Sequence, residues 1–293
     1  VALKFVEILL EAGLPPLAVS CLTGSGATVG NAICRDRRVR KISFTGSQEV
    51  GEQICRIAGL KKVTMELGSN SPLIVMPDAD LTIAAQGAAN AIFFNHGQVC
   101  CAGSRLYVHK KHFDRVVADV SDIAANLPLG HGLDANAQMG PLVSARQQQR
   151  VQDYINQGLE AGARATVGGQ AYEGDGYYVN PTVLVDVDQQ SAVTREEIFG
   201  PVLVAMPFDD MDEAIRIAND SQYGLGASIW SNNLSEVHRM IPRIKSGSVW
   251  VNCHTALDPS LPFGGFKQSG LGREMGREVL EHYTEVKSVV INL

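Results

Sequence analysis

The chain has 293 residues, which is enough for one large domain or two ordinary domains with hydrophobic cores. Hydrophobic residues make up 45% of it and charged residues 19%, as in an ordinary globular protein, and no stretch approaches the roughly 18 uninterrupted apolar residues of a membrane span. The net charge of −6 argues against a nucleic-acid surface, and the basic run over residues 35–41 is short, so it is typical of a solvated loop.

Six cysteines are scattered along the chain without the dense spacing of a disulfide scaffold. This usage indicates a reducing compartment, so we expect a cytoplasmic protein, while a targeting segment upstream of Val1 stays an open alternative. The adjacent pair Cys100 and Cys101 has no CxxC or HxxxH partner, so we expect no metal site.

Strand and helix patterns alternate through the first 60 residues. The expected elements are a helix over 1–11, a strand over 18–22, a helix over 29–35, a strand over 39–44 and a helix over 49–58. Alternation of this kind predicts a parallel sheet. The run Gly24–Gly30 reads GxGxxxG, which is one residue longer than the usual dinucleotide fingerprint and is weak on its own.

Gly46 and Ser47 stand between the strand over 39–44 and the helix that follows it. At such a junction the unpaired N–H groups and the dipole of the helix favour a bound phosphate. The sequence therefore predicts a phosphate contact here. Ser47 can also simply cap its helix, and the two roles are compatible.

Glu66 closes a predicted strand over 62–68, in which Val63, Met65 and Leu67 share one face. It shares the other face with Thr64 and runs directly into a polar turn. A carboxylate at that place can lie over a cleft, where a general base belongs. The alternative is an exposed glutamate at the end of a strand.

Cys100 follows an apolar helix predicted over 81–94, which breaks at residues 95–97 (Asn-His-Gly). A short β-prone run over 106–108 comes next. A cysteine on a tight loop between a packed helix and a strand is a fixed thiol, which suits a nucleophile. The alternative is a buried cysteine that only fills space.

The alternation of strands and helices then restarts. The expected elements are a strand over 73–76, helices over 112–127 and 145–160, a strand over 177–184, a helix over 211–219, a strand over 226–230, a helix over 235–244, a strand over 248–252 and a weak terminal strand over 286–293. Residues 128–144 are expected to form a loop. Residues 196–201 (EEIFGP) form a stiff turn that aims a carboxylate and a ring, although a pair of glutamates is often only solvated.

Two of these motifs occur in a fixed order and at a characteristic distance. Residues 66–72 read ELGSNSP and residues 94–100 read FNHGQVC, with 34 residues from Glu66 to Cys100. Together they resemble the signature motifs of the aldehyde dehydrogenase superfamily, as do residues 44–47 (FTGS) and 196–201. The family commonly has Gly-Lys where this chain has Ser69-Asn70, and neither position performs the chemistry.

The resemblance implies the roles of the site residues. Cys100 would be the nucleophile, with Glu66 as the base that activates water for hydrolysis of a Cys100 thioester. The implied cofactor-binding residues are Gly46, Ser47, Leu67, Glu197 and Phe199. Within this set Glu197 would hold the nicotinamide ribose and Phe199 would pack beside the nicotinamide. NAD is the expected cofactor, with NADP as the alternative.

The resemblance also implies a substrate tunnel and a class of aldehyde. The tunnel positions are Phe94, Val99, Cys101, Leu257 and Phe263. All are apolar or soft and none is arginine, which favours an apolar aldehyde over one that carries a carboxylate. Residues 251–262 look most like the bacterial phenylacetaldehyde dehydrogenase branch, and an aliphatic or betaine-type aldehyde is the alternative.

The implied architecture is α/β, with a partial Rossmann-like parallel sheet and an α/β catalytic domain. Residues 1–68 would form the second half of the NAD(P)-binding domain, 69–276 the catalytic domain and 277–293 an oligomerisation segment whose terminal strand joins a neighbouring subunit. A homodimer or homotetramer is expected. The family's upstream part, with an asparagine of the oxyanion hole, lies outside this chain, so we expect the chain alone to be inactive.

Two functions from other classes stay open on the sequence alone. A cofactor-free thiol esterase could use the same Cys100 and Glu66, although it would need neither residues 44–47 nor residues 196–201. A non-catalytic interaction protein on the same scaffold is the other alternative, and the presence of both Cys100 and Glu66 argues against it.

Overall fold

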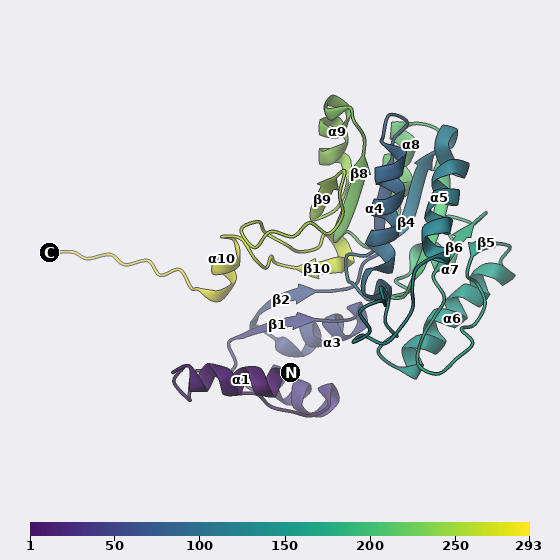
Figure 1. Ribbon diagram of the computed structural model, residues 1–293. Helices are drawn as coiled ribbons and strands as arrows, with labels where there is room; N and C mark the ends of the chain where they lie inside the picture. The colour runs from purple at the N-terminus through teal and green to yellow at the C-terminus, as the bar shows by residue number, and fades with distance from the viewer.

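Two β-sheets organise the chain, and Glu66 ends the central strand of the smaller one. The computed structural model describes residues 1–293 (Figure 1). The small sheet has the order β1-β2-β10, formed by β1 (Lys41–Thr45), β2 (Lys62–Glu66) and β10 (Gly270–Leu271). β1 runs parallel to β2 and pairs Thr45 with Glu66, whereas β10 runs antiparallel and pairs Gly270 with Glu66. The base candidate is therefore held from both sides.

The large sheet has seven strands in the order β5-β6-β7-β4-β3-β8-β9. They are β3 (Ser71–Val75), β4 (Gly103–His109), β5 (Arg164–Val167), β6 (Thr182–Val185), β7 (Val202–Phe208), β8 (Gly226–Trp230) and β9 (Ser248–Val251). Only β5 runs antiparallel to its neighbour, and all other pairs are parallel. The predicted α/β class with parallel sheets is confirmed.

Helices cover both faces of the large sheet. The helices of the chain are α1 (Ala2–Glu11), α2 (Asn31–Arg35), α3 (Gln48–Ala58), α4 (Leu81–Phe93), α5 (Phe113–Ala125), α6 (Ala145–Glu160), α7 (Ala192–Arg195), α8 (Met211–Asn219), α9 (Leu234–Met240) and α10 (Val279–Tyr283). α4 and α5 pack on one face, and α8 and α9 on the other. None of these helices combines the length and the apolar character that crossing a lipid bilayer requires.

Strand β3 shows how the sequence builds these two cores. Leu73 and Val75 point into the core under α4 and α5, while Ile74 between them points into the core under α8 and α9. All three side chains are fully buried. A strand buried on both faces reads as a continuous apolar run, as predicted for this segment.

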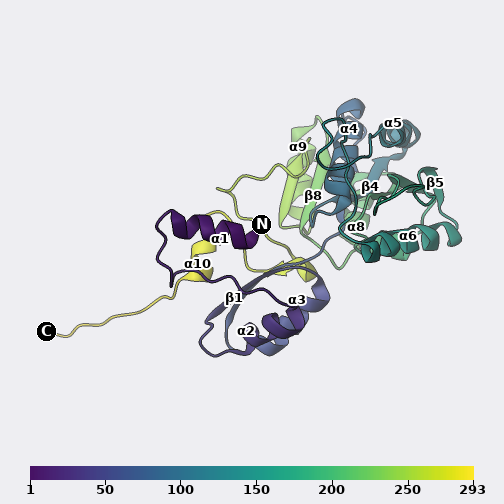
Figure 2. The same cartoon turned by 60° about the horizontal axis from the view of Figure 1, so that its bottom comes forward.

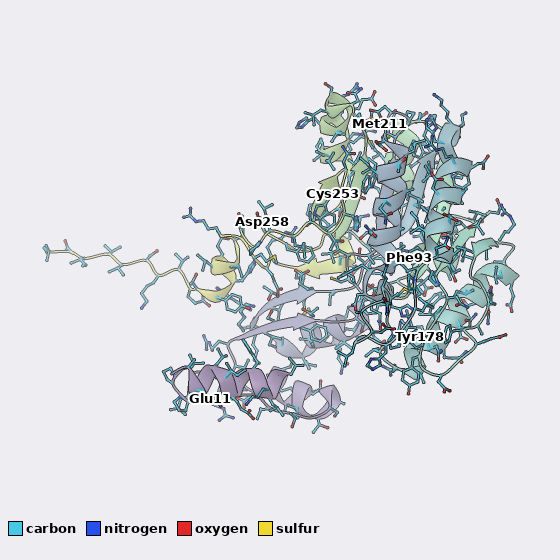
Figure 3. The ribbon with its side chains drawn as sticks, in the orientation of Figure 1. Glu11, Phe93, Tyr178, Met211, Cys253 and Asp258 are labelled. Atoms are coloured by element: carbon cyan, nitrogen blue, oxygen red, sulfur yellow. The ribbon has the colours of Figure 1, made fainter.

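The small sheet and its helices lie beside the large-sheet body rather than within it. Figure 2 shows β1 with α1, α2, α3 and α10 on one side and the helices α4, α5, α6, α8 and α9 on the other. Phe93, at the end of α4 nearest the small sheet, marks where the two parts meet (Figure 3). The domain boundaries at residues 68 and 276 stay predictions.

Helix α4 starts and ends where the sequence indicates. Asp80 caps it, because its Oδ1 accepts hydrogen bonds from the N–H groups of Thr82 (3.0 Å) and Ile83 (3.1 Å). The helix is rich in alanine, and Gly87 allows the ring of Trp230 to approach its backbone closely. This helix carries the chain from the outer end of the sheet to the Cys100 loop.

Replacing Gly87 by valine is expected to lower the free energy of unfolding by about 1–3 kcal/mol or more. The added Cβ would meet Cη2 of Trp230 at 2.0 Å, and that side chain is only 2% exposed, so the ring or the helix must shift. Urea denaturation measures the effect. Gly30→Ala is the control, since nothing lies within 4 Å of a Cβ built there. Equal unfolding midpoints for Gly87→Val and the unsubstituted protein would contradict the packing described here.

Three predicted strands differ from the structure. Residues 18–22 form no strand, because the chain offers no neighbouring strand to pair with them. Residues 286–293 form no strand within the single chain, and their pairing with a neighbouring subunit stays a prediction. The tail extends away from the body in Figure 1. The strand predicted over 177–184 is limited to Thr182–Val185, since Pro181 lacks an N–H group and the residues before it form a loop.

Candidate active site

The loop that carries Cys100 is folded by three consecutive residues with positive φ. Asn95 has φ 51°, His96 φ 58° and Gly97 φ 69°, so the chain reverses immediately after α4. A Cβ at Gly97 would lie 2.1 Å from the carbonyl oxygen of Gly200, which only glycine permits. The turn predicted at residues 95–97 is confirmed, and it fixes where the next residues lie.

Two histidines hold the same loop against its surroundings. His96 is buried, and its ring nitrogens face the carbonyl oxygens of Gly140 (at Nδ1) and Val179 (3.1 Å from Nε2). Nε2 of His254 lies 2.7 Å from the carbonyl oxygen of Cys101. Burial lowers the pKa of His254 to about 4, so the ring is neutral near pH 7 and its Nε2–H donates to Cys101. The loop is therefore anchored on both sides of Cys100.

Cys100 is half-buried, whereas Cys101 is 2% exposed. Contact with the Cys101 thiol, together with burial, raises the pKa of Cys100 well above its ordinary value. The backbone N–H of Cys100 donates to no acceptor of this chain. The site therefore holds a thiol that needs a base, next to a free N–H donor.

Glu66 is only 4% exposed, and its Oε2 has no hydrogen-bond partner. Burial raises the pKa of Glu66 to about 8, and the nearby carboxylate of Glu274 and the Cys100 thiol add to the shift. A carboxyl group with a pKa near neutrality and a free oxygen can both accept and return a proton.

Glu66 and Cys100 line the same cavity, which has a volume of about 640 Å³. The predicted residues that share this cavity are Gly46, Ser47, Glu66, Leu67, Cys100, Glu197 and Phe199. They come from the turn between β1 and α3, the end of β2 with the residue after it, the loop after α4 and the segment after α7, which are far apart in the sequence. The structure thus brings together all seven residues predicted for catalysis and cofactor binding.

The N-terminus of α3 forms one wall of this cavity. Ser47 caps the helix, since its Oγ accepts a hydrogen bond from the N–H of Val50 at 3.4 Å. Thr45, Gly46 and Glu49 also line the wall. The capping role of Ser47 is confirmed, and the helix end beside it is the kind of site that binds phosphate groups.

Glu197 also lines this cavity, and a backbone N–H group holds its carboxylate. Its Oε1 accepts a hydrogen bond from the N–H of Ser69 at 2.9 Å, and a Cβ at Gly68 would lie 2.3 Å from its Oε2. Burial raises the pKa of Glu197 to about 7, while the Ser69 hydrogen bond and the charge of Arg150 oppose that shift. Phe199 lines the same cavity. Its backbone has φ 58°, and the residue is 36% exposed.

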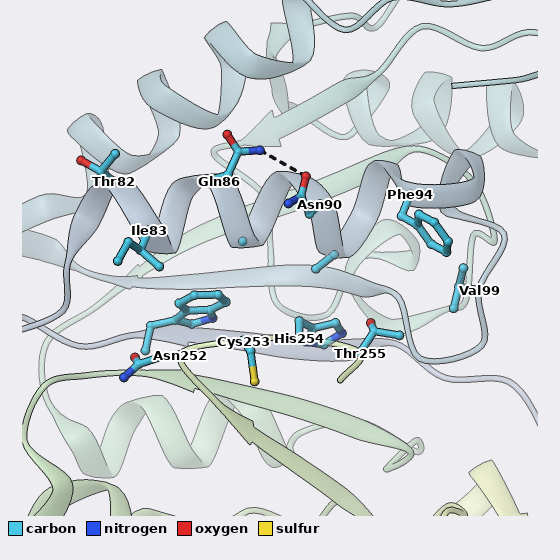
Figure 4. Close-up of a pocket in the computed structure, with 13 residues that line it drawn as sticks. Thr82, Ile83, Gln86, Asn90, Phe94, Val99, Asn252, Cys253, His254 and Thr255 are labelled. Atoms are coloured by element: carbon cyan, nitrogen blue, oxygen red, sulfur yellow. Dashed lines mark hydrogen bonds between the residues drawn. The ribbon is translucent and has the colours of Figure 1, made fainter. Parts of the chain in front are cut away.

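The five predicted tunnel residues do not line a single cavity. Phe94 and Val99 line a second cavity of about 920 Å³ along α4, together with Trp230, Cys253 and Thr255 (Figure 4). Cys101 and Phe263 belong instead to a small apolar cluster with Leu225 and Trp250, against which Val99 and Cys100 also pack. Leu257 is 49% exposed and lines neither cavity.

The sequence did not single out several polar residues of the site. Arg146, Gln147 and Arg150 from α6 line the first cavity, and Arg150 Nη2 donates a hydrogen bond of 2.9 Å to the carbonyl oxygen of Glu197. Their spacing on one helix face was visible, but it looks the same as that of a solvated face. His254 lay in a segment noted only for its resemblance to one branch of the family.

Comparison with known proteins matches this arrangement to one family. The family model "Aldehyde dehydrogenase family" matches residues 1–289. Phenylacetaldehyde dehydrogenase of Pseudomonas fluorescens is 48% identical over 294 residues, which are 99% of this chain and 59% of that protein. Betaine aldehyde dehydrogenase of Cereibacter sphaeroides is 42% identical, over 100% of this chain and 61% of that protein.

A solved structure agrees with these matches. The NAD+ complex of an aldehyde dehydrogenase from Bacillus cereus superposes with a TM-score of 0.98 at 44% identity, covering 100% of this chain and 60% of that one. The chain thus spans about three fifths of the length of the relatives it matches. From its sequence, its fold and the family model, the chain belongs to the aldehyde dehydrogenase family.

Proposed function

We propose that the full-length protein oxidises an aldehyde to its carboxylic acid with NAD+ as the hydride acceptor. The supporting observation is that Cys100 and Glu66 line one cavity with the N-terminus of α3 and with Glu197. The test is an absorbance assay of NADH formation by the full-length protein against a panel of aldehydes, with NAD+ and NADP+ in turn. No reduced cofactor from any aldehyde would refute the proposal.

The first step joins Cys100 to the aldehyde. The Cys100 thiol loses its proton, its sulfur forms a bond to the carbonyl carbon, and the carbonyl oxygen becomes an oxyanion. Cys100 is half-buried, so this proton leaves to solvent water, and Glu66 keeps its free Oε2 for the second stage. The free N–H of Cys100 stabilises the oxyanion, and losing one such donor costs roughly 10²–10³ in rate.

The second stage releases the acid. When bound, the nicotinamide ring supplies the acceptor for the hydride that leaves the former carbonyl carbon, so that a thioester remains on Cys100. Glu66 then takes a proton from water, and the hydroxide oxygen adds to the thioester carbon. The carbon–sulfur bond breaks, the carboxylic acid leaves, and Cys100 regains its proton from Glu66.

The residues around the cavity suit a nicotinamide dinucleotide. The capped N-terminus of α3 offers N–H groups and a dipole to the pyrophosphate, with Gly46 and Ser47 at that end. Glu197 would accept hydrogen bonds from the ribose hydroxyls, while Leu67 and Phe199 would give apolar contacts. NAD+ is favoured over NADP+ because a solved relative is described as an NAD+ complex.

An apolar, aromatic aldehyde such as phenylacetaldehyde is the proposed substrate. Val99, the residue before Cys100, lines a cavity with Phe94 in which no residue is lysine or arginine, so an aldehyde with a carboxylate would find no counter-ion there. The 48% identity to phenylacetaldehyde dehydrogenase points the same way, and the betaine-type relative at 42% supplies the second candidate. A cytoplasmic homodimer or homotetramer completes the proposal, and light scattering tests the oligomeric state.

The affinity for NAD+ is expected to rise as pH increases through about 7. The pKa of Glu197 is about 7, and the ionised carboxylate accepts ribose hydrogen bonds better than the neutral acid. Glu197→Gln should remove this pH dependence and weaken binding by about 10- to 100-fold, as expected for loss of a hydrogen bond to a charged group. Calorimetric titration on both sides of pH 7 measures it. An unchanged pH dependence in Glu197→Gln would contradict the assignment.

A further inference from the structure

Asn70 joins three parts of the candidate site, although its side chain does not line the cavity. It lies in the turn between β2, which ends at Glu66, and β3, which begins at Ser71. The residue is 2% exposed. A polar side chain buried to this degree must have its hydrogen bonds satisfied, so the identity of its partners indicates what it does.

Both donors of the Asn70 amide are directed at the segment that leads to Glu197. Nδ2 donates to the carbonyl oxygens of Thr194 (2.7 Å) and Glu196 (3.1 Å). The second of these carbonyls belongs to the residue immediately before Glu197. The preceding residue, Ser69, donates its N–H to the Glu197 carboxylate itself. The turn therefore holds Glu197 through its backbone and through its side chain.

The acceptors of Asn70 face the strand that follows Cys100. Ser104 Oγ donates to Asn70 Oδ1 at 2.7 Å, and Arg105 Nε donates to the Asn70 carbonyl oxygen at 2.9 Å. Arg105 is itself 1% exposed, and its other hydrogen bonds go to Tyr107 and to the carbonyl oxygens of Ile217 and Ala218. This end of the network is thus fixed in the core, and it gives the Asn70 amide a rigid support.

We infer that Asn70 is a positioning residue that sets where the Glu197 carboxylate stands in the cavity. An amide suits this place in this chain because the same side chain donates to two carbonyl oxygens and accepts from a hydroxyl group. The inference rests on the proposed function, since Glu197 is the proposed ribose contact. Asn70 touches neither the cofactor nor the reacting atoms, and it acts only through the segment that it holds.

Asn70→Asp removes the donor bonds of the Asn70 side chain and keeps its acceptor bond. Aspartate keeps the shape and the Oδ1 acceptor for Ser104, but it sets an oxygen instead of an N–H donor against the carbonyls of Thr194 and Glu196. The dissociation constant for NAD+ should rise by about 10- to 100-fold. Hydrolysis of p-nitrophenyl acetate without cofactor, which needs only Cys100 and Glu66, should stay within about twofold.

Two comparisons distinguish positioning from a general structural role. In a Glu197→Gln background, Asn70→Asp should add little to the dissociation constant, because effects that act through one residue are not additive. Asn180→Asp is the matched control: Asn180 Nδ2 also donates to two carbonyl oxygens, those of Gln170 (3.2 Å) and Ala171 (3.4 Å), which lie outside the cavity. This control should leave both readouts unchanged.

The full-length protein is used throughout, and circular dichroism checks each variant for folding. Should Asn70→Asp fail to fold, Asn70→Ala, which removes the donors without adding an opposed oxygen, should weaken NAD+ binding in the same selective way. Unchanged NAD+ binding in the Asn70 variants, or an equal loss of ester hydrolysis, would overturn the inference. Absence of NAD+ binding in the unsubstituted protein would instead refute the proposed function.

Discussion

Replacing Cys100 by alanine is expected to abolish aldehyde oxidation by the full-length protein, with a loss of at least about 10⁴-fold in kcat. The sulfur is the atom that forms and breaks the bond to substrate carbon, and nothing else in the cavity can replace it: its other polar side chains belong to Thr45, Ser47, Glu49, Glu66, Arg146, Gln147, Arg150 and Glu197. NADH formation under saturating aldehyde measures the loss. Binding of NAD+ should stay close to its original strength, because Cys100 is not a proposed cofactor contact.

The control for this experiment is another cysteine. Cys21 is a free, half-buried cysteine that does not line the cavity, so Cys21→Ala should keep full activity. The pair of variants separates the general effect of losing a thiol from the effect of losing this one. Turnover by Cys100→Ala within tenfold of the original rate would contradict the assignment of Cys100 as the nucleophile.

Replacing Glu66 by glutamine is expected to lower kcat by about 10²–10⁴-fold, the usual contribution of a general base. The thioester should then form but not hydrolyse, so a single equivalent of NADH per site would appear as a burst. In the original protein the rate should rise as pH increases through about 8, where Glu66 ionises. The variant should lack this rise. A variant that turns over at the original rate, or keeps the same pH profile, would contradict the role of Glu66.

The same carboxyl group has a predictable effect on stability. Burial raises the pKa of Glu66 from an ordinary value of 4.5 to about 8, so the folded state favours its neutral form. The stability contributed by this preference is fully present below about pH 4.5 and is lost as pH rises through about 8. Between about pH 4.5 and pH 8, the free energy of unfolding should therefore fall less in Glu66→Gln than in the original protein. Urea denaturation at several pH values tests the sign.

Local patterns were sufficient to predict most elements that hold the site. The apolar run over 81–94 and the break at residues 95–97 predicted α4 and the turn before Cys100. The alternation around Met65 predicted β2, and its register against Thr45 and Gly270 became visible only in the structure. The helix, the turn and the strand themselves depend on neighbours in the sequence, which is why the sequence alone was enough to predict them.

Long-range hydrogen bonds could not be read from the sequence. Asn70 and Thr194 are 124 residues apart, and His254 and Cys101 are 153 residues apart. Neither asparagine nor histidine in a loop indicates which backbone carbonyl it will meet. The predicted strand over 18–22 was wrong for a related reason: a β-prone run becomes a strand only where a partner strand lies beside it. The strand predicted over 286–293 is expected to pair with a neighbouring subunit, so it stays a prediction.

Trapping the acyl intermediate is the decisive experiment for the roles of Cys100 and Glu66. Glu66→Gln full-length protein is incubated with phenylacetaldehyde and NAD+, quenched in acid, digested and analysed by mass spectrometry. A phenylacetyl group is expected on Cys100, in a stoichiometric amount that depends on NAD+, and none is expected in Cys100→Ala/Glu66→Gln. An acyl group on a different residue, or none while NADH is still produced, would contradict the claim that Cys100 and Glu66 act on the same carbonyl carbon.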